Sequence, residues 1–529
     1  MSGHNAKEQK YDVVIVGGGH NGLVAGCYLA LAGKKPVILE ASHKIGGMAS
    51  SSYAIPEAPN HLIHSCALEL ASLRGGTIPK DLDLERHGFR MIECDPAYAY
   101  LHTDGSSLCF FKDVGRTVAE ISKYSKKDAS AYVEFVKTLG ALASIVGPIM
   151  KADPSRMGMS TMYTAAKNAF KNRKIKDDLL SFLTGSAVQI AEERFEHPAV
   201  RSAIAGFAGG AGPISTDTSS LGYLLFAILH STGFARVEGG MQMFSNALAA
   251  RFEELGGTVI TNASVSEIVS ENKTVRGART EDGRFFSGKS VIGACHPYVT
   301  MNLVTDGEMD EHLLTRVRHA PRAAHGSSPF RMDVALNGRV NWEHHQKERK
   351  DGIDLRLPTV MIGSWETAVE NFAAASRGEI PKDPYCWFST PTAADPTQAP
   401  DGQDSLYFYP TAWPVRPRDG WDVARPQSVE RCLEWARTIF PDIDAKIIGM
   451  RVESADQLEA RLNVPGGCFV HTDVTLLRSG SMRPAAGLAG ELPVAGLIFG
   501  SAGGPGGGGV SGVPGTIAAS RTLRYLKKI

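Results

Sequence analysis

The first apolar segment of the chain is the unbroken run Val13–Val16, which follows the polar residue Asp12. Such a run is typical of a parallel strand that is buried on both faces. Apolar residues continue over Leu23–Leu31 and predict a helix that stops near Gly33. A second apolar run begins at Pro36 and ends at Glu40, which predicts the next strand. The pattern therefore predicts strand, helix and strand, the unit that begins a doubly wound α/β domain.

The same kind of pattern returns later in the chain. Five apolar residues recur at helical spacing and predict a helix that ends at Gly256–Gly257: Met241, Phe244, Leu248, Phe252 and Leu255. Short strands are predicted at Thr258–Thr261 and Ser290–Ala294. Because this helix and strand pattern recurs, we predict a discontinuous nucleotide-binding domain made of residues 1–105, 225–300 and 456–529. Residues 106–224 are helix-rich and 301–455 are rich in Pro and Trp, and we expect them to form an interleaved α+β substrate domain.

Glycines separate the first predicted strand from its helix. Gly17 would make the tight turn, Gly19 would let the backbone approach a pyrophosphate, and Gly22 would let the helix pack on the strand. His20 and Asn21 lie at the helix N-terminus, whose N–H groups would face the phosphates.

An acidic residue completes this motif. Glu40 follows the glycines by about 20 residues, where a carboxylate accepts hydrogen bonds from ribose hydroxyls and repels the 2′-phosphate of NADP. The combination predicts a dinucleotide site, and a flexible glycine loop before an amphipathic helix is the alternative interpretation.

A second glycine-rich segment, residues 500–515, lies near the other end of the chain. Gly504–Gly509 are expected to pass close to a flat cofactor ring, and a helix is expected to open over Val510–Ala519. We name Gly500, Ser501, Gly508 and Val510 as contact residues of this loop. Two glycine-rich motifs favour a large two-part cofactor such as FAD over NAD alone, whereas a mobile tail is the alternative.

Further short segments carry a family resemblance. Gly46–Gly47 closely follow Glu40 in the string Leu39–Met48, and Glu238–Met241 and Gly496–Ser501 add to it. These segments resemble flavoproteins of the amine oxidase and phytoene desaturase group, above all the branch named as pyridine nucleotide-disulphide oxidoreductase domain proteins.

The resemblance implies an α/β fold: a Rossmann-like FAD-binding domain of that type, interleaved with the α+β substrate domain. It implies non-covalent FAD, with the segment after Glu40 among its contacts and the backbone of Val265 beside the adenine. The contacts expected in that segment are Ala41, Lys44, Gly46, Gly47 and Met48. Members of the group often carry Arg two residues after the Glu, where this chain has Ser42, so Lys44 is the nearest cation.

The resemblance also implies an activity. It predicts an FAD-dependent dehydrogenase or oxidase that takes a hydride from a C–C, C–N or C–O bond of a hydrophobic small molecule to flavin N5. Residues 205–212 are rich in glycine, but no apolar strand leads into them, so we expect close backbone packing near the substrate cavity rather than a second nucleotide site. Electrons would then leave to oxygen, a quinone or a protein. A redox-neutral polyene isomerase and a flavin-loaded scaffold for protein interaction are the two alternatives.

Four residues are candidates for a pocket acid or base. They are His64, His230, His471 and Tyr409, although each is more often a hydrogen-bonded structural residue. His61, His64 and Cys66 could imitate metal ligands, but their spacing fits no structural zinc pattern, so no metal is expected.

The composition of the chain indicates which classes of partner and which cellular location to expect. Of the 529 residues 43% are hydrophobic and the formal net charge is zero, so nothing indicates a nucleic-acid surface. Eight cysteines without a CxxC pair, and no signal peptide before Tyr11, favour an intracellular location, cytoplasmic or peripheral to a membrane, with a mitochondrial one weakly supported.

The sequence leaves membrane contact and assembly open. No segment reaches the roughly 18 apolar residues that span a bilayer. The basic stretch 165–176 is either a solvated helix face or, together with the apolar residues 141–150, a peripheral membrane contact. The oligomeric state is also open, a homodimer included.

Overall fold

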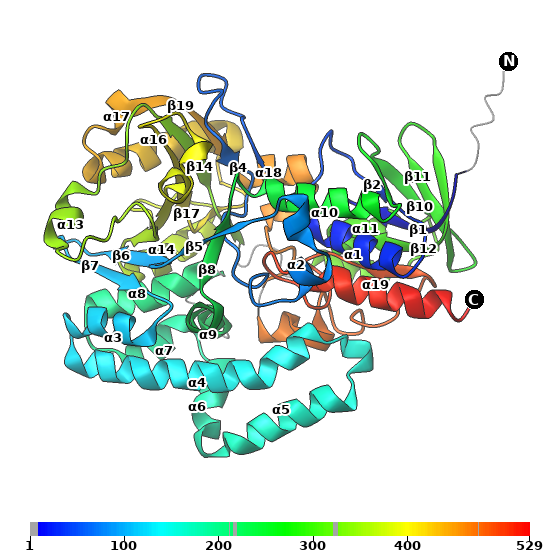
Figure 1. The fold of residues 1–529 in the computed structure, drawn as a ribbon, viewed down its shortest axis with the longest axis horizontal. Helices are drawn as coiled ribbons and strands as arrows, with labels where there is room; N and C mark the ends of the chain where they lie inside the picture. Colours follow the sequence, from blue (N-terminus) through cyan, green and yellow to red (C-terminus); the bar gives the residue numbers. More distant parts are fainter. Residues whose placement is uncertain (1–8, 211, 215–218, 321–325, 474) are drawn as a thin grey trace.

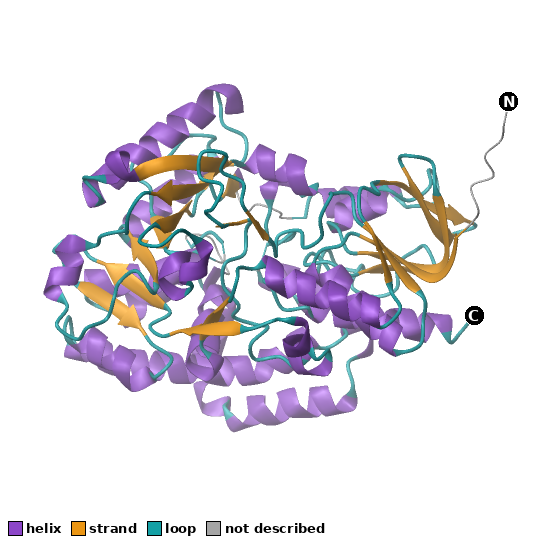
Figure 2. Ribbon diagram, turned by 45° about the horizontal axis from the view of Figure 1, so that its top comes forward, coloured by secondary structure: helices purple, strands orange, loops and turns teal. Residues whose placement is uncertain are grey.

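The computed structural model describes residues 9–210, 212–214, 219–320, 326–473 and 475–529. Within these ranges the chain forms two sheets of seven strands each, one on the right and one on the left of Figure 1. Figure 2 shows helices around both sheets, with a large helical group along one side of the molecule. We call the part around the first sheet the cofactor domain and the part around the other sheet the second domain.

Strands of the first sheet come from distant parts of the chain. Their order is β10 (Val265–Glu271), β11 (Thr274–Thr280), β12 (Phe285–Gly293), β1 (Gln9–Val16), β2 (Pro36–Leu39) and β9 (Thr258–Ile260), and β20 (Leu497–Phe499) also pairs with β12. The pairs β12–β1, β1–β2, β2–β9 and β12–β20 are parallel, whereas β10, β11 and β12 pair antiparallel.

Both faces of β1 are buried, as its apolar run predicts. Val13 and Ile15 pack in one cluster with α1 (His20–Leu31), α10 (Gln242–Glu254) and α19 (Val513–Leu526). Val14 and Val16 belong to a cluster on the other face. Successive side chains of a strand point to opposite faces, so covering both faces requires an apolar residue at every position.

The second sheet also joins distant segments. Its order is β19 (Ile447–Glu453), β14 (Arg331–Leu336), β17 (Asp404–Pro410), β16 (Cys386–Ser389), β15 (Thr359–Ile362), β6 (Tyr98–Leu101) and β7 (Ser107–Phe110). Only the β15–β6 pair of this sheet is parallel. Tyr98 and Tyr100 face the helical group, while Ala99 and Leu101 belong to a cluster with α16 (Trp421–Ile439).

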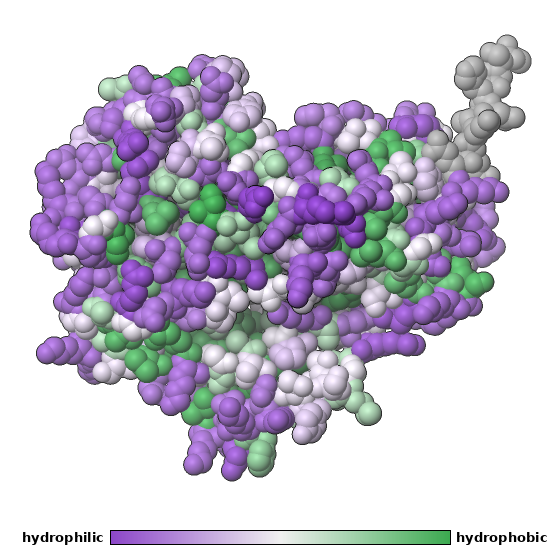
Figure 3. Space-filling model, in the orientation of Figure 1, coloured by the Kyte–Doolittle hydropathy of each residue, from purple (hydrophilic) through white to green (hydrophobic). Residues whose placement is uncertain are grey.

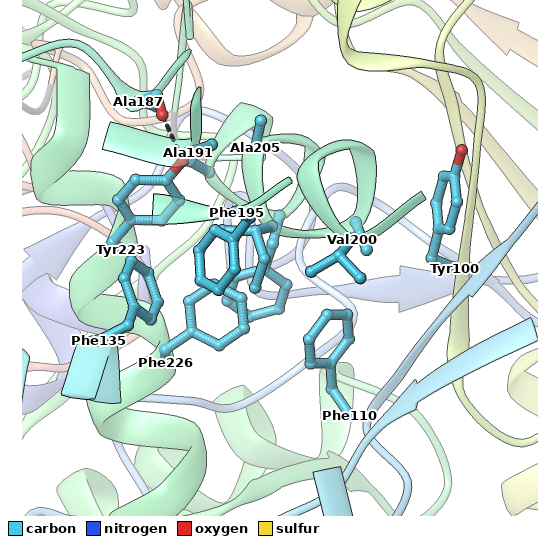
Figure 4. Packing of buried hydrophobic residues seen from close by; sticks show 14 of the residues in the cluster. Tyr100, Phe110, Phe135, Ala187, Ala191, Phe195, Val200, Ala205, Tyr223 and Phe226 are labelled. Carbon is cyan, nitrogen blue, oxygen red and sulfur yellow. Dashed lines mark hydrogen bonds between the residues drawn. The ribbon is translucent and has the colours of Figure 1, made fainter. Parts of the chain in front are cut away.

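Seven helices make the helical group: α3 (Val114–Ser122), α4 (Lys126–Lys151), α5 (Met159–Lys171), α6 (Lys176–Thr184), α7 (Ala187–Arg194), α8 (Pro198–Gly209) and α9 (Leu224–Thr232). Their core is aromatic, and Figure 4 shows Phe135, Phe195 and Phe226 packed together. The buried Tyr223 hydroxyl donates to Ala187 O at 2.5 Å, which satisfies its polar atom inside this core.

Short elements connect the two domains. Three two-stranded ladders are β3 (Ser51–Ser52) with β4 (Ile63–His64), β5 (Met91–Cys94) with β8 (Phe234–Val237), and β13 (Ser327–Ser328) with β18 (Trp413–Pro414). The remaining helices are α2 (Ile78–Asp81), α11 (Pro297–Asn302), α12 (Glu311–Arg318), α13 (Glu343–Glu348), α14 (Trp365–Ser376), α15 (Pro391–Ala394), α17 (Ile443–Lys446) and α18 (Ala455–Leu462).

Two expected domain boundaries differ from the structure. β6 begins at Tyr98 and pairs in the second sheet, so the second domain starts before the expected residue 105. α9 packs Phe226 and Leu229 into the helical core, so residues 225–232 do not belong to the cofactor domain. In both cases the partner of the segment is far away in the sequence.

Helix α4 corrects one expectation about membranes. It contains an 18-residue window of mean hydropathy 1.5, of which only 22% is buried, so it meets the length and composition of a membrane span. It is the one described helix that does so. Its first half nevertheless carries buried core residues such as Tyr132, Phe135 and Leu139, and long core helices of soluble proteins pass the same test.

Candidate functional site

The N-terminal glycines have the roles that their spacing predicts. Gly17 has a φ of +105°, which a side chain rarely adopts, and it makes the turn after β1. A Cβ on Gly22 would lie 2.3 Å from Gly17 O, so α1 packs on the turn without room for a side chain. A Cβ on Gly19 would meet no protein atom within 4 Å, because Gly19 borders open space.

That space is a cavity of about 710 Å³. Thirteen of the predicted contact residues and acid–base candidates line it; twelve of them are Gly17, Gly19, His20, Asn21, Glu40, Ala41, Gly46, Gly47, Met48, Val265, Val510 and His471. Tyr409 lines it as well, from β17 of the second domain. Gly22, Lys44, Gly500, Ser501 and Gly508 lie outside its lining.

Glu40 lies at the end of β2 with both carboxylate oxygens held by backbone. Oε2 accepts from Gly18 N–H at 2.7 Å and Oε1 accepts from Ser42 N–H at 2.8 Å. Burial raises the pKa of the Glu40 carboxyl, and these two N–H donors oppose that shift. Each oxygen can accept a further hydrogen bond, so the fixed carboxylate can hold the hydroxyls of a ribose.

The Gly46–Gly47 pair lies against the first glycine motif. Gly46 N–H donates to Gly18 O at 2.9 Å, and Gly46 bridges to Gly19. Both glycines have positive φ, +114° and +56°. Glu40 to Gly47 thus wrap around the N-terminus of α1, where N–H groups and the helix dipole favour an anion.

Lys44 does not face the cavity. Its ammonium donates to Ser51 O at 3.0 Å. Burial lowers the pKa of Lys44, and the charges of Arg461 and Arg451 lower it further. Within the described ranges Arg461 is the only Lys or Arg on the cavity lining.

The C-terminal glycine loop is folded tightly upon itself and against the cofactor domain. A Cβ on Gly507 would lie 1.8 Å from Ala502 O, and one on Gly500 would lie 2.6 Å from the Ile292 side chain. Gly509 and Val510 reach the cavity. The helix opens at Val513, three residues later than the expected Val510, because Gly512 adopts a left-handed conformation as its N-cap and Pro514 follows in the first turn.

Two of the four acid–base candidates lie away from the cavity. His64 is buried and its Nε2 lies 3.0 Å from Gln398 Oε1, and burial lowers its pKa to about 4. His230 contacts the Tyr132 hydroxyl at 2.8 Å and Lys112 O at 3.0 Å inside the helical group. Their neighbours make both of them structural residues, which corrects the expectation of a pocket role.

The other two candidates reach the cavity. His471 has a φ of +62°, and its Nδ1 is buried without a hydrogen-bond partner. Burial above all lowers the pKa of His471 well below its usual range, so the ring is neutral. Tyr409 is partly buried, and desolvation raises the pKa of its hydroxyl.

Sequence inspection missed Glu69. Its carboxylate lines the cavity, accepts from the Tyr98 hydroxyl at 2.5 Å and from the Thr359 hydroxyl, and lies 3.8 Å from Arg236 Nη2. The signal in the sequence that could have identified this residue is its position as a single acidic residue between Leu68 and Leu70. Three of its partners come from other segments, so the sequence alone did not show that it is buried and paired.

Aromatic side chains enclose this end of the cavity. The lining there includes Tyr98, Trp387, Tyr407, Tyr409 and Phe469. The close backbone packing expected for residues 205–212 is confirmed at Gly210, which also lines the cavity and where a Cβ would lie 2.0 Å from the Trp387 ring. Gly206 likewise has no Cβ, and this leaves room for the Tyr385 hydroxyl.

The comparisons with known proteins agree with this geometry. The model of the family described as "Flavin containing amine oxidoreductase" matches residues 22–456, which is most of the chain. The chain belongs to the flavin-containing amine oxidoreductase family. FAD is therefore its cofactor, and the protein is an FAD-dependent oxidoreductase.

The sequence identity of the chain to individual relatives is low. The chain is 25% identical to pyridine nucleotide-disulfide oxidoreductase domain-containing protein 2 of Mus musculus, over 100% of this chain and 96% of the relative. It is 24% identical to a carotenoid 3,4-desaturase of Haloarcula japonica, over 89% and 90% of the two chains. The crystal structure of an oxidoreductase from Methanosarcina mazei superposes with a TM-score of 0.62 at 16% identity, covering 98% of this chain and 100% of that one.

The cavity fits the cofactor of this family. Four buried polar atoms on its lining have no hydrogen-bond partner among the described residues: Trp387 Nε1 at the aromatic end, and His20 Nε2, Asn21 Oδ1 and His471 Nδ1. Buried polar atoms of this kind are normally satisfied, so they indicate a bound polar group. Together with the open space at Gly19 and the fixed Glu40 carboxylate, they form a cradle for a dinucleotide. None of the eight cysteines, all of which lie in the described ranges, forms a disulfide.

Proposed function

We propose that the protein dehydrogenates a largely apolar small molecule. The observation that carries this proposal is that one cavity is bordered by Gly19 and Glu40 at one end and by Tyr98, Trp387 and Tyr409 at the other. When held by Gly19, Glu40 and their neighbours, FAD would supply an acceptor for a hydride from a substrate carbon and a carrier of two electrons to oxygen, a quinone or a protein. The name of the carotenoid 3,4-desaturase relative describes a reaction on an apolar polyene, which supports the substrate class.

The aromatic lining would position the substrate and exclude water. Tyr407 and Tyr409 are stacked with ring centroids 5.7 Å apart, and the Tyr407 hydroxyl donates to Cys66 O at 3.0 Å. Flat, fixed rings of this kind favour an extended or cyclic apolar molecule over a flexible polar one. Trp387 Nε1 is buried without a partner and can donate to a single oxygen or nitrogen of that molecule.

Loss of a hydride from carbon leaves a proton to be removed. When the new double bond forms, the proton departs from the neighbouring carbon, nitrogen or oxygen of the substrate, and its bonding pair becomes the second bond. We propose that the Glu69 carboxylate accepts this proton, because it is the carboxylate at the aromatic end of the cavity. Tyr98 and Thr359 each donate a hydrogen bond to it and so fix its orientation.

An anaerobic titration tests the proposal. Holoprotein is mixed with panels of apolar alcohols, amines and polyenes, and the visible flavin absorbance is followed. Stoichiometric bleaching by one member, together with an oxidised product found by mass spectrometry, is the expected result. Turnover only after prior reduction of the flavin would instead indicate an isomerase and would overturn the proposal. The substrate itself can be sought among small molecules that co-purify with the protein.

We also propose a peripheral contact with an anionic bilayer through α5. Its outward face carries Met159, Met162, Tyr163 and Phe170, of which Met159 is 88% and Phe170 is 68% exposed. Ala165 and Asn168 face inward, and Asn168 Nδ2 donates to Ser144 O of α4 at 2.8 Å. Figure 1 places α5 at the lower edge of the molecule, and Figure 3 shows apolar and polar residues mixed along that edge.

Basic residues border this apolar face. They are Lys167, Lys171, Arg173, Lys174 and Lys176. An exposed apolar stripe with cations beside it is the arrangement by which amphipathic helices lie in the interface of an anionic membrane. Sedimentation with vesicles tests this: binding to vesicles with anionic lipid, lost in Phe170→Asp, is expected. The exposed Val423→Asp on α16 is the control, and equal binding of wild type and Phe170→Asp would refute the contact.

A further inference from the structure

A group of five charged side chains, three of them buried, lies beside the cavity and has an excess of positive charge. Across the β14–β19 pair, Arg331 lies opposite Glu453 and Asp333 opposite Arg451. Arg331 makes ion pairs with Asp333 at 3.1 Å and with Glu453 at 3.0 Å. Arg451 lies 2.8 Å from Glu453.

Helix α18 adds the third guanidinium. It begins directly after β19 and carries Arg461 in its last turn, before Asn463 ends the helix with a φ of +51°. Arg461 holds Glu453 with two hydrogen bonds, of 2.6 Å and 2.9 Å. Three guanidinium groups therefore share two carboxylates, and the group is left with one unpaired positive charge.

Three of the five charges are poorly solvated, whereas the side chain of Arg461 is 30% exposed. The side chains of Arg331, Asp333 and Glu453 are at most 5% exposed. Burial lowers the pKa of Arg451, and Arg331 and Arg461 lower it further. Lys44 adds one more cation at the edge of the group. Its pKa is also lowered, by burial and by the charges of Arg461 and Arg451. An excess positive charge of this kind is stabilised by a nearby anion, and among the described residues the ion pairs of Arg451 and Arg461 reach no carboxylate other than Glu453.

The contacts of Arg461 place it close to the glycine pair of the cofactor domain. Its Nη1 donates to Ser65 Oγ at 2.6 Å. Ser65 N–H donates to Ser50 O at 2.8 Å and Ala67 N–H donates to Met48 O at 3.1 Å. Arg461 is thus bonded to a segment that pairs with the residues just after Gly47, and both Gly47 and Arg461 line the cavity.

We propose that Arg461 supplies the positive charge for the pyrophosphate of FAD that the segment after Glu40 lacks. In that segment Ser42 stands where a cation was expected, and the Lys44 ammonium is bonded to Ser51 O instead. The guanidinium comes from α18, directly after the last strand of the second sheet, so the bound cofactor would be linked electrostatically to that sheet. This inference rests on FAD as the cofactor and is independent of the substrate.

Release of FAD from the holoprotein tests the proposal. Arg461→Gln removes the charge, while Glu453 keeps Arg331 and Arg451 as partners, so the fold should persist. Arg461→Lys keeps the charge but not the forked geometry. The control is Arg425→Gln: Arg425 pairs with Asp456 of α18 at 2.6 Å but does not line the cavity.

FAD fluorescence after dilution, at several NaCl concentrations, gives the dissociation constant. For Arg461→Gln we expect it to rise by about tenfold or more, which is the scale of one charge-assisted hydrogen bond, with a weaker dependence on salt. Arg461→Lys should be intermediate and Arg425→Gln unchanged. The ³¹P resonances of bound FAD should shift in Arg461→Gln alone. Unchanged release and unchanged ³¹P resonances in Arg461→Gln, or equal loss in Arg425→Gln, would overturn the proposal.

Discussion

Gly515 of α19 lies directly on Asn21 of α1: a Cβ on Gly515 would be 2.3 Å from Asn21 O. The two glycine-rich segments at opposite ends of the chain are therefore in contact through their helices. This contact fixes the C-terminal loop relative to the turn at Gly17–Gly19.

Gly515→Ala should separate these helices. Overpacking a tight contact typically costs about 1–3 kcal/mol, so the free energy of unfolding should fall by that amount. FAD release should also become faster, because Val510 is displaced from the cavity. Urea unfolding and FAD fluorescence measure the two effects. Ser520→Ala, at an exposed position of α19, is the control, and a Gly515→Ala protein as stable as wild type would show that the helices yield without cost.

Gly19→Val should give a folded protein without FAD. The added side chain meets no protein atom within 4 Å of its Cβ but enters the cavity beside the N-terminus of α1. The ratio of flavin to protein absorbance should fall to that of apoprotein, while the unfolding midpoint should equal that of wild-type apoprotein. Gly140→Val, on α4 with open space at its Cβ, should retain FAD. Full flavin content in Gly19→Val would place the pyrophosphate elsewhere.

Glu40→Ala should weaken FAD binding. Loss of the carboxylate removes charge-assisted hydrogen bonds to the ribose, which is worth about 1.5–3 kcal/mol. The dissociation constant, measured by flavin fluorescence, should rise accordingly. An unchanged constant would mean that the carboxylate only caps the backbone of Gly18 and Ser42.

Glu69→Gln should slow reduction of the flavin without releasing it. The amide keeps the shape of the side chain but cannot accept the substrate proton, and loss of such a base costs about 10²–10⁴-fold in rate. Stopped-flow bleaching with a substrate found by the anaerobic titration measures this rate. His230→Gln, away from the cavity, should react at the wild-type rate. Unimpaired bleaching in Glu69→Gln would exclude Glu69 as the proton acceptor.

His64 should make the protein less stable in acid. Its pKa is about 4 in the folded protein because of burial, and 6.5 is its ordinary value. The unfolded chain therefore binds the proton first as pH falls, and the free energy of unfolding decreases between pH 6.5 and about 4. The shift corresponds to about 3 kcal/mol at most.

His64→Gln should lose less stability over this pH range. Its amide can still bond Gln398, so urea unfolding at neutral and acidic pH isolates the protonation of residue 64. Exposed His43→Gln serves as the comparison. Identical pH dependence in wild type and His64→Gln would contradict the assignment.

The local sequence pattern was sufficient to predict the cofactor-binding turn. The β1 run, the glycine spacing and Glu40 lie within one strand–helix–strand unit, so their roles depend on neighbours in the sequence. The packing of residues 205–212 was also predictable, because consecutive glycines indicate close approach of another segment. The structure confirms the turn at Gly17 and the close packing at Gly22 and Gly210, whereas the cofactor contacts of Gly19 and Glu40 stay predictions.

Long-range pairing could not be predicted from the pattern. β6 joins the second sheet through β15, whose Thr359 lies opposite Tyr98. Glu69 gains its partners Thr359 and Arg236 only through that arrangement. His230 lies in an apolar helix whose orientation the sequence does not specify, and its ring bonds Lys112 O instead of reaching the cavity.

The pairing of β20 with β12 has a consequence for biosynthesis. β20 and α19 leave the ribosome after every other strand of this sheet, yet β20 pairs with β12 next to β1. Until they emerge, one edge of β12 at Val291–Gly293 and the face of α1 that receives Gly515 lack their partners. Nascent chains with exposed strand edges and apolar surface aggregate readily, so we expect this chain to depend on chaperones until β20 and α19 have emerged.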